Sequence, residues 1–335
     1  MASGLNGNLS RKQRAALPPG ERQSIVKNLV VEHDRFMDAF AAIGSFHMPV
    51  KGGEADFGVL TCICGDSRTG KTFVLERYAR QFVRSEGEAG VIRPVVYVDM
   101  PIDCNLRSMA EQIANALNVN HTQRMNNAGL VGAVLKALKK QEVQFLILDE
   151  FQEAFDVNRK KTLKDARGLL RKILNLRSLN ICVGGLVDTY ELLANDAQLK
   201  GRGLLPHHMV AAYDWDDVED RKLFRLLCDF IDDLLPFREK SSLGSLAVAQ
   251  RLYWVTDGVI GLLKEFVFAA ACRAINAGAD SIENKHFSEA WDIRKPIGQQ
   301  FNPFNDAIEE APPKNGATAP AAKGKKITDN IFSKA

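Results

Sequence analysis

The sequence lacks long apolar runs, metal-ligand spacing and a strong charge of either sign. Its N-terminal residues are polar and indicate neither a signal peptide nor a membrane span. Among six cysteines, Cys62 and Cys64 alternate without a second pair at metal-ligand spacing, which argues against a zinc site and favours buried thiols in a reducing cytoplasm. The net charge of +3 is too small to indicate a nucleic-acid partner by itself.

Internal repeats, helix-turn-helix patterns and zinc-finger patterns are also missing. Any DNA binding is therefore expected to have little sequence preference. The remaining composition is ordinary for a globular protein, with 46% hydrophobic and 25% charged residues. A chain of 335 residues has room for two domains and a tail.

The most informative stretch, residues 65–72, reads Gly-Asp-Ser-Arg-Thr-Gly-Lys-Thr. It fits the phosphate-binding loop pattern at every fixed position: the glycines allow a tight turn, Lys71 reaches the β- and γ-phosphates, and the Thr72 hydroxyl binds Mg²⁺. A chance match is the alternative, but an apolar strand pattern precedes the loop and an amphipathic helix pattern follows it. The predicted nucleotide-binding residues are Gly65, Asp66, Ser67, Arg68, Thr69, Gly70, Lys71, Thr72 and Phe73.

A second motif is the apolar run 143–150, which ends in Asp149 and Glu150. We expect this strand to lie beside the strand before the phosphate loop, with its carboxylates at the carboxyl edge of the sheet. Asp149 would then hold Mg²⁺ together with Thr72, and Glu150 would activate the attacking water as general base. An ordinary buried strand with an acidic end is the alternative, and the order of the two motifs favours the Walker B interpretation.

The remaining pattern predicts the fold class. Strands are expected at 58–64, 94–100, 143–150, 179–183 and 209–213, with helices between them and only helices after Trp215. This is the layout of an α/β AAA+ P-loop NTPase, with a five-stranded parallel sheet followed by a helical lid. The expected divisions are a flexible arm at 1–19, the nucleotide-binding domain with N-terminal helices at 20–214, the lid at 215–295, and a disordered tail at 296–335. The tail is either idle or a partner-binding peptide.

Several stretches outside the two motifs are more specific. They are Asp-Ala-Gln-Leu-Lys-Gly-Arg at 196–202, Trp215, Leu-Leu-Pro at 234–236 and Thr-Asp-Gly-Val-Ile-Gly at 256–261. Over about residues 20–287 the chain resembles the TniB/TnsC family of transposition AAA+ ATPases. Such proteins bind ATP and Mg²⁺ and assemble as rings or helical filaments on double-stranded DNA, in the bacterial cytoplasm. They connect a target-selection protein, such as a TniQ-type adaptor, to the transposase.

The resemblance also assigns individual roles. Arg202 falls at the position of the arginine finger, which would meet the γ-phosphate of ATP on a neighbouring subunit; from the sequence alone it is equally well a solvated loop arginine. Gly184 and Gly185 stand where a polar sensor residue is usual, and Gly261 stands where a lid arginine is usual, although Lys264 lies one turn further on. Fewer polar contacts predict slow hydrolysis.

Arg107 and Arg124 are the candidates for DNA phosphate contacts, because the elements after the second strand can face the central channel of an AAA+ ring. Each is otherwise a solvated charge. Two other functions stay open: a nucleotide-gated scaffold or signalling ATPase that binds only proteins, and a clamp- or helicase-loader ATPase of replication.

Overall fold

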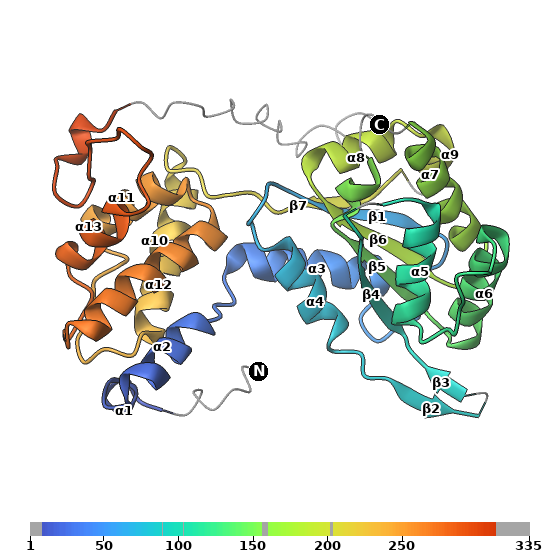
Figure 1. Cartoon of the computed structure of the whole chain (residues 1–335), viewed down its shortest axis with the longest axis horizontal. Helices are drawn as coiled ribbons and strands as arrows, with labels where there is room; N and C mark the ends of the chain where they lie inside the picture. The colour runs from blue at the N-terminus through green and yellow to red at the C-terminus, as the bar shows by residue number, and fades with distance from the viewer. Residues whose placement is uncertain (1–8, 89, 103, 156–159, 202–203, 313–335) are drawn as a thin grey trace, which may run out of the picture.

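The computed structural model describes residues 9–88, 90–102, 104–155, 160–201 and 204–312, which form an α/β lobe and a helical lobe (Figure 1). The α/β lobe is built on one five-stranded parallel sheet with strand order β4-β5-β6-β1-β7. The strands are β1 (Leu60–Cys64), β4 (Val95–Asp99), β5 (Phe145–Asp149), β6 (Asn180–Gly185) and β7 (His207–Met209). All residues of β1, β5 and β6 are buried, as expected for central parallel strands covered on both faces.

The order of the strands corrects one expectation. β5 does not lie beside β1, because β6 is inserted between them and pairs with both. The register nevertheless aligns the carboxyl ends, with Cys64 opposite Gly185 and Asp99 opposite Asp149. The phosphate loop and the acidic pair therefore still meet at one edge of the sheet, on either side of the end of β6.

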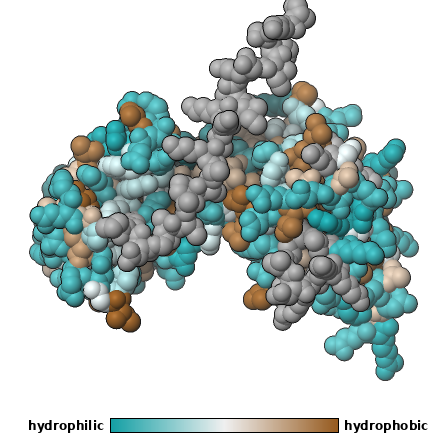
Figure 2. Space-filling view, turned by 90° about the horizontal axis from the view of Figure 1, so that it is seen from above, coloured by the Kyte–Doolittle hydropathy of each residue, from teal (hydrophilic) through white to brown (hydrophobic). Residues whose placement is uncertain are grey.

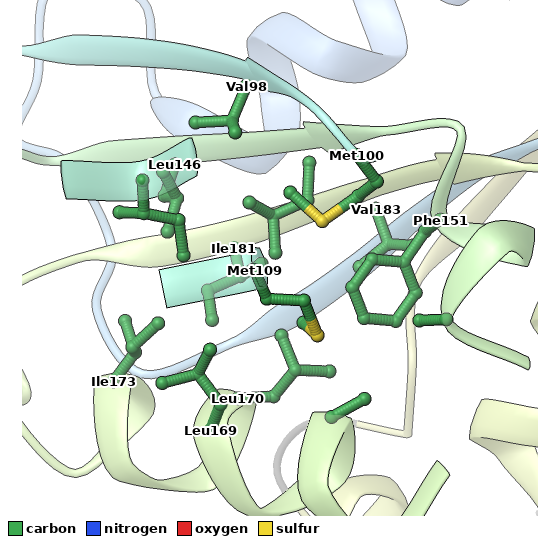
Figure 3. Close-up of a cluster of buried hydrophobic side chains, with 14 of the residues drawn as sticks. Val98, Met100, Met109, Leu146, Phe151, Leu169, Leu170, Ile173, Ile181 and Val183 are labelled. Carbon is green, nitrogen blue, oxygen red and sulfur yellow. The ribbon is translucent and has the colours of Figure 1, made fainter. Parts of the chain in front are cut away.

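Helices cover both faces of this sheet (Figure 1). α3 and α4 pack on one face, and α5 and α7 lie on the other, where their apolar side chains meet those of the strands (Figure 3). α6 packs on α5. The helices of this lobe are α3 (Asp34–His47), α4 (Lys71–Ala79), α5 (Leu106–Ala116), α6 (Asn127–Lys140), α7 (Lys160–Leu174), α8 (Val187–Ala194), α9 (Ala197–Lys200) and a 3-10 helix at Phe151–Phe155.

The helical lobe contains the lid predicted after Trp215. α12 is its central helix: α11 and α13 pack on it, and its alanines at 269–271 allow the helices to approach closely. Asp217 starts the lobe by capping α10, accepting hydrogen bonds from the N–H groups of Glu219 and Asp220. Its helices are α10 (Val218–Leu234), α11 (Leu246–Thr256), α12 (Ile260–Asn276) and α13 (Asn284–Asp292).

The N-terminal segment belongs to this lobe, which differs from the expected division. Residues predicted as a flexible arm form α1 (Arg11–Ala15), closed at its start by a Ser10–Gln13 capping box. Arg11 donates to the carbonyl groups of Asp232 and Glu239. α2 (Pro19–Lys27) packs on α12 instead of on the sheet.

The start of the predicted disordered tail is also ordered. Phe304 and Asn302 are buried, and the indole N–H of Trp291 donates to the carbonyl of Phe301 at 2.9 Å. Residues 308–310 form a short 3-10 helix. The apolar and amide side chains of this segment complete the lid core, which the proline-rich composition did not reveal. Residues 313–335, with the possible partner-binding peptide, lie outside the described residues.

Within the described residues the chain crosses between the lobes twice: residues 28–33 lead from α2 to α3, and residues 210–217 lead from β7 to α10. They are tied to each other, because the Tyr213 hydroxyl donates to the Asp34 carboxylate and the Arg35 guanidinium lies over the Tyr213 ring at 5.1 Å. Arg35 also pairs with Asp220 of α10 at 2.6 Å. The two crossings therefore form one polar joint.

Two smaller differences concern the edges of the α/β lobe. The last strand is shorter and earlier than the predicted 209–213, because its chain leaves the sheet after Met209 toward the lid. An antiparallel hairpin of β2 (Ser85–Gly87) and β3 (Gly90–Ile92) was not predicted, since its two strands are too short to show a pattern.

Hydrophilic residues cover most of both lobes in the space-filling view (Figure 2). Within the described ranges, no helix combines the length and apolar character that a bilayer crossing requires.

Candidate nucleotide-binding site

The phosphate loop joins β1 to α4 at the carboxyl edge of the sheet. Gly65 permits a close backbone approach, since a Cβ there would lie 2.2 Å from the carbonyl oxygen of Val210. Gly70 precedes α4 with a φ of 98°, a conformation that favours glycine. Thr69 is buried, and its hydroxyl donates to the carbonyl of Asp66 at 2.9 Å. The loop thus holds its N–H groups near the positive end of the α4 dipole, which suits an anion.

Lys71 is turned back onto its own loop. Its Nζ donates to the carbonyl oxygens of Gly65 at 2.9 Å and Asp66 at 2.6 Å. Burial lowers the pKa of Lys71, and the nearby carboxylates of Glu150 and Asp149 oppose this shift. A phosphate group entering the loop would replace these carbonyl contacts with charge-assisted ones, which are stronger.

The acidic residues of β5 meet the first turn of α4. Asp149 is buried, and its carboxylate accepts hydrogen bonds from the Tyr97 hydroxyl at 2.9 Å and the Glu150 N–H at 2.8 Å. The Thr72 hydroxyl lies 3.5 Å from Oε1 of Glu150. Thr72 and Asp149 offer a hydroxyl and a carboxylate oxygen, which are ligands that suit Mg²⁺. Burial and the Asp149 charge raise the pKa of Tyr97, so Tyr97 stays a hydrogen-bond donor.

Gln152 is a neighbour of Glu150 that the motifs did not single out. Its side-chain N–H donates to Oε2 of Glu150, and its own Oε1 is buried and has no hydrogen-bond partner among the residues that the structure describes. Glu150 has a φ of 51°, a left-handed backbone that is uncommon for residues with a Cβ. Strained residues concentrate at functional sites, which agrees with the predicted role of Glu150. The sequence shows that Gln152 follows Glu150 by two residues, but it does not show that the two side chains form a hydrogen bond.

The glycine pair at the end of β6 is explained by crowding. A Cβ on Gly184 would lie 2.5 Å from Oδ1 of Asp149, and a Cβ on Gly185 would lie 2.6 Å from the Thr189 hydroxyl. No side chain fits at Gly184 without displacing Asp149. The polar sensor that the resemblance leads one to expect at this position is therefore sterically excluded.

An apolar pocket lies next to the loop, between the lobes. The first crossing, the second crossing, α4 and the lid each contribute side chains to it. Its lining includes Leu29, Val30, Val31, Phe73, Val210, Leu227, Ile231 and Ile260. Such a pocket suits an aromatic base, and together with the loop donors and the oxygen ligands of Thr72 and Asp149 it fits a nucleoside triphosphate with a divalent cation.

Three ionisable residues line this apolar pocket, namely His33, Arg68 and Lys264. Burial lowers the pKa of His33 to about 4, and its Nδ1 accepts from the N–H of Phe36 at 3.3 Å, so the ring is neutral with its proton on Nε2. Burial also lowers the pKa of Lys264, which comes from the lid. The sequence analysis considered Lys264 but missed His33, because the position of His33 beside the pocket depends on how the first crossing runs between the lobes.

The predicted arginine finger, Arg202, lies outside the described residues. The helix just before it is anchored to the α/β lobe: Asp196 caps α9 and pairs with Arg167 at 3.5 Å, and Arg171 donates to Gln198. The segment that leads to Arg202 therefore starts from a fixed point.

The two arginines predicted to contact DNA differ in their surroundings. The Arg107 guanidinium donates to the carbonyl of Met125 at 2.7 Å and pairs with Glu111 at 2.8 Å. It therefore holds the loop between α5 and α6 in place. Arg124, at the tip of that loop, is exposed. Only Arg124 presents its charge to the outside, although both residues lie near the starts of α5 and α6.

Comparison with known proteins identifies the fold. The chain has a TM-score of 0.58 with Cdc6p from Pyrobaculum aerophilum, at 15% identity over 81% of this chain and 70% of that one. With the ORC1 protein of Aeropyrum pernix in complex with DNA, the TM-score is 0.59, at 15% identity over 82% and 69% of the two chains. With the ORC2 protein of the same organism, solved as ADPNP–ADP complexes, it is 0.55, at 16% identity over 80% and 71%.

At this level of identity the three structures establish the fold alone. No curated protein sequence matches the chain. The family assignment comes from a different comparison: residues 43–209, which contain the phosphate loop, the acidic pair and all five strands of the sheet, match the family model described as bacterial TniB protein. The chain belongs to the TniB family of transposition proteins and has the fold of an AAA+ ATPase.

Proposed function

We propose that this TniB-family protein binds ATP and Mg²⁺ between its lobes and, in that state, assembles on double-stranded DNA to connect a target-selection protein with a transposase. One observation carries the proposal: Lys71, Asp149 and Glu150 converge at one edge of the sheet, beside an apolar pocket that the lid closes. A triphosphate would thereby lie at the sheet edge of the α/β lobe, and the base would lie beside it in the pocket between the lobes. A nucleotide bound there would contact both lobes at once.

The chemistry assigned to the site is ATP hydrolysis. Loop N–H groups and Lys71 bind the β- and γ-phosphates, Thr72 and Asp149 hold Mg²⁺, and Glu150 orients the attacking water. The glycine at Gly184 leaves one polar contact to the transition state unmade. Each tenfold loss of rate corresponds to about 1.4 kcal/mol, so one missing contact is enough for a slow ATPase. We place this activity in the bacterial cytoplasm, where the six free cysteines would stay reduced.

Assembly depends on Arg202 in this proposal. Its guanidinium reaches the γ-phosphate of ATP bound to the next subunit, so homo-oligomers form as rings or filaments only with the triphosphate present. The helix just before this residue is held to the α/β lobe by the Arg167–Asp196 pair.

The DNA-binding surface is assigned to the loop between α5 and α6. Arg124 is exposed there, and the starts of α5 and α6 add their positive dipole ends. A groove beside α5 and α6 is lined by Lys164 and Lys172 of α7. These contacts would bind phosphates without reading bases, and an archaeal protein of the same fold was solved in complex with DNA. The transposase and a TniQ-type adaptor are the partners that family membership implies.

A gel shift with random-sequence duplex DNA tests the proposal. The protein should shift the duplex at moderate salt with a non-hydrolysable ATP analogue and should not do so without nucleotide. Lys71→Ala should abolish the shift together with nucleotide binding. Arg124→Ala should weaken binding severalfold and reduce the salt dependence, whereas Arg80→Ala, at an exposed arginine directly after α4, serves as the matched control. Nucleotide binding without any shift would contradict the DNA-binding function.

A further inference from the structure

Arg68 has an unusual backbone conformation for its residue type. Its φ is 65°, in the left-handed region that residues with a Cβ rarely adopt. A glycine at this position of the loop would take the same conformation without strain. Strain of this kind persists where surrounding contacts hold it, so the contacts of Arg68 are informative.

Arg68 touches the first turns of α12 at two points. Its carbonyl oxygen accepts a hydrogen bond from the Gly261 N–H at 2.9 Å, and its Nη1 lies 2.5 Å from Oε2 of Glu265. Gly261 permits this approach, because a Cβ there would lie 2.7 Å from the Arg68 carbonyl oxygen and 2.9 Å from its Cβ. One residue of the phosphate loop is thus joined to the lid through both its backbone and its side chain.

The same part of α12 closes one side of the apolar pocket, through Ile260, Gly261 and Lys264. Arg68 also lines this pocket, whereas Glu265 is not part of the lining that the described residues form. A movement of α12 away from the loop would therefore open the pocket on the side of the phosphates. Glu265 can influence a bound nucleotide only through the residue it pairs with.

We propose that Arg68 is a positioning residue that fastens the lid to the phosphate loop and thereby slows release of the bound nucleotide. The inference rests on the proposed ATP binding and deepens it, because it names the contact through which the loop and the lid hold the ligand together. Arg68 acts here through Glu265 and Gly261. Its guanidinium needs no contact with the phosphates.

The expected effect of this contact on the rate of nucleotide release depends on how exposed the ion pair is. The Arg68 and Glu265 side chains are 50% and 64% exposed, so their ion pair is modest and weakens with salt. A pair of this kind predicts a roughly three- to fivefold effect on the rate of nucleotide release. The hydrogen bond from Gly261 remains when either side chain is removed.

A double-mutant cycle on release of a fluorescent ATP analogue tests the coupling. Arg68→Ala and Glu265→Ala should each speed release roughly three- to fivefold, and the double variant should be no faster than the faster single variant. Effects that multiply in the double variant would show that the two side chains act independently of each other and would overturn the inference. A wild-type release rate for Glu265→Ala would overturn it as well.

Two further measurements separate this inference from the proposed function. Glu76 of α4 and Arg80, the residue directly after α4, form an ion pair at 2.7 Å, and the same cycle on that pair should leave release unchanged. Hydrogen exchange of the amides at 259–263 in nucleotide-free protein should be several-fold faster in Glu265→Ala. Unchanged hydrogen exchange in Glu265→Ala would overturn the lid contact, even if the protein binds ATP normally. If the protein does not bind ATP, the proposed function is overturned, and the exchange measurement still tests the lid contact by itself.

Discussion

The phosphate half of the candidate site is polar and comes from two short motifs, whereas the base half is apolar and comes from several separate segments of both lobes. The polar half contains residues with left-handed backbones, Arg68 and Glu150, and a lysine bonded to its own loop. The apolar half contains ordinary core side chains such as Val210 and Leu227. The difference shows that the chemistry is specified locally, while the shape of the pocket depends on how the lobes are joined.

The largest expected effect isolates chemistry in the polar half. Glu150→Gln should lower single-turnover ATP hydrolysis by about 10²- to 10³-fold, because an amide cannot take a proton from the attacking water. ATP affinity should change by no more than about twofold, since Lys71 and the loop stay intact. Glu153→Gln, three residues further on, is the matched control. An unchanged hydrolysis rate in Glu150→Gln would remove this residue as the base.

The second effect is a pH dependence of the free energy of unfolding. It arises at His33, in the first crossing between the lobes. The pKa of His33 is about 4 in the folded protein, because burial disfavours its charged form, against an ordinary value near 6.5. As pH falls below 6.5, the unfolded chain binds a proton that the folded protein does not bind until about pH 4. Stability should therefore fall by about 2 kcal/mol between pH 7.5 and pH 5 through this group.

Urea denaturation followed by tryptophan fluorescence measures this loss, because Trp215, Trp254 and Trp291 all lie in or beside the helical lobe. His33→Asn is the matched variant: asparagine also caps helices but does not titrate. Its stability should fall less between the two pH values than that of the wild type. Equal losses in both proteins would show that His33 is not responsible.

The smallest expected effect probes the apolar half alone. Phe73→Ala should weaken ATP and ADP binding equally, by about fivefold, because burial of a partly exposed ring against a base contributes about 1 kcal/mol. Hydrolysis at saturating ATP should stay within about twofold. Equilibrium titration with both nucleotides measures it, and a loss confined to ATP would place Phe73 near the γ-phosphate instead of the base.

The comparison also explains what the sequence could predict. The phosphate loop and the acidic pair are contiguous, and their backbone geometry follows from a few fixed residues, so both were found and both lie at the same edge of the sheet. The AAA+ fold was predicted from the same motifs and from the helical character after Trp215. The contacts of Tyr97 and Gln152 with the acidic pair were not, because they depend on register between strands and on a short turn.

The errors have a common physical cause, namely contacts between segments distant in the chain. The insertion of β6 between β1 and β5 is a matter of topology that strand composition does not encode. α1 and residues 301–304 look like termini by composition but pack on the lid, where Arg11 finds carbonyl partners and Phe304 finds a core. His33 and the pocket lining follow from the same long-range arrangement.

The two crossings between the lobes have a mechanical consequence. A lid joined to the α/β lobe by two crossings has fewer ways to move than a lid joined by one, so we expect rotation about the line through the crossings to be its easiest movement. The pocket lies beside that line, since Val31 and Val210 belong to the crossings themselves. A shortened chain starting at residue 34 would retain every motif and lose one of the two pivots, leaving a lid that swings without a fixed axis.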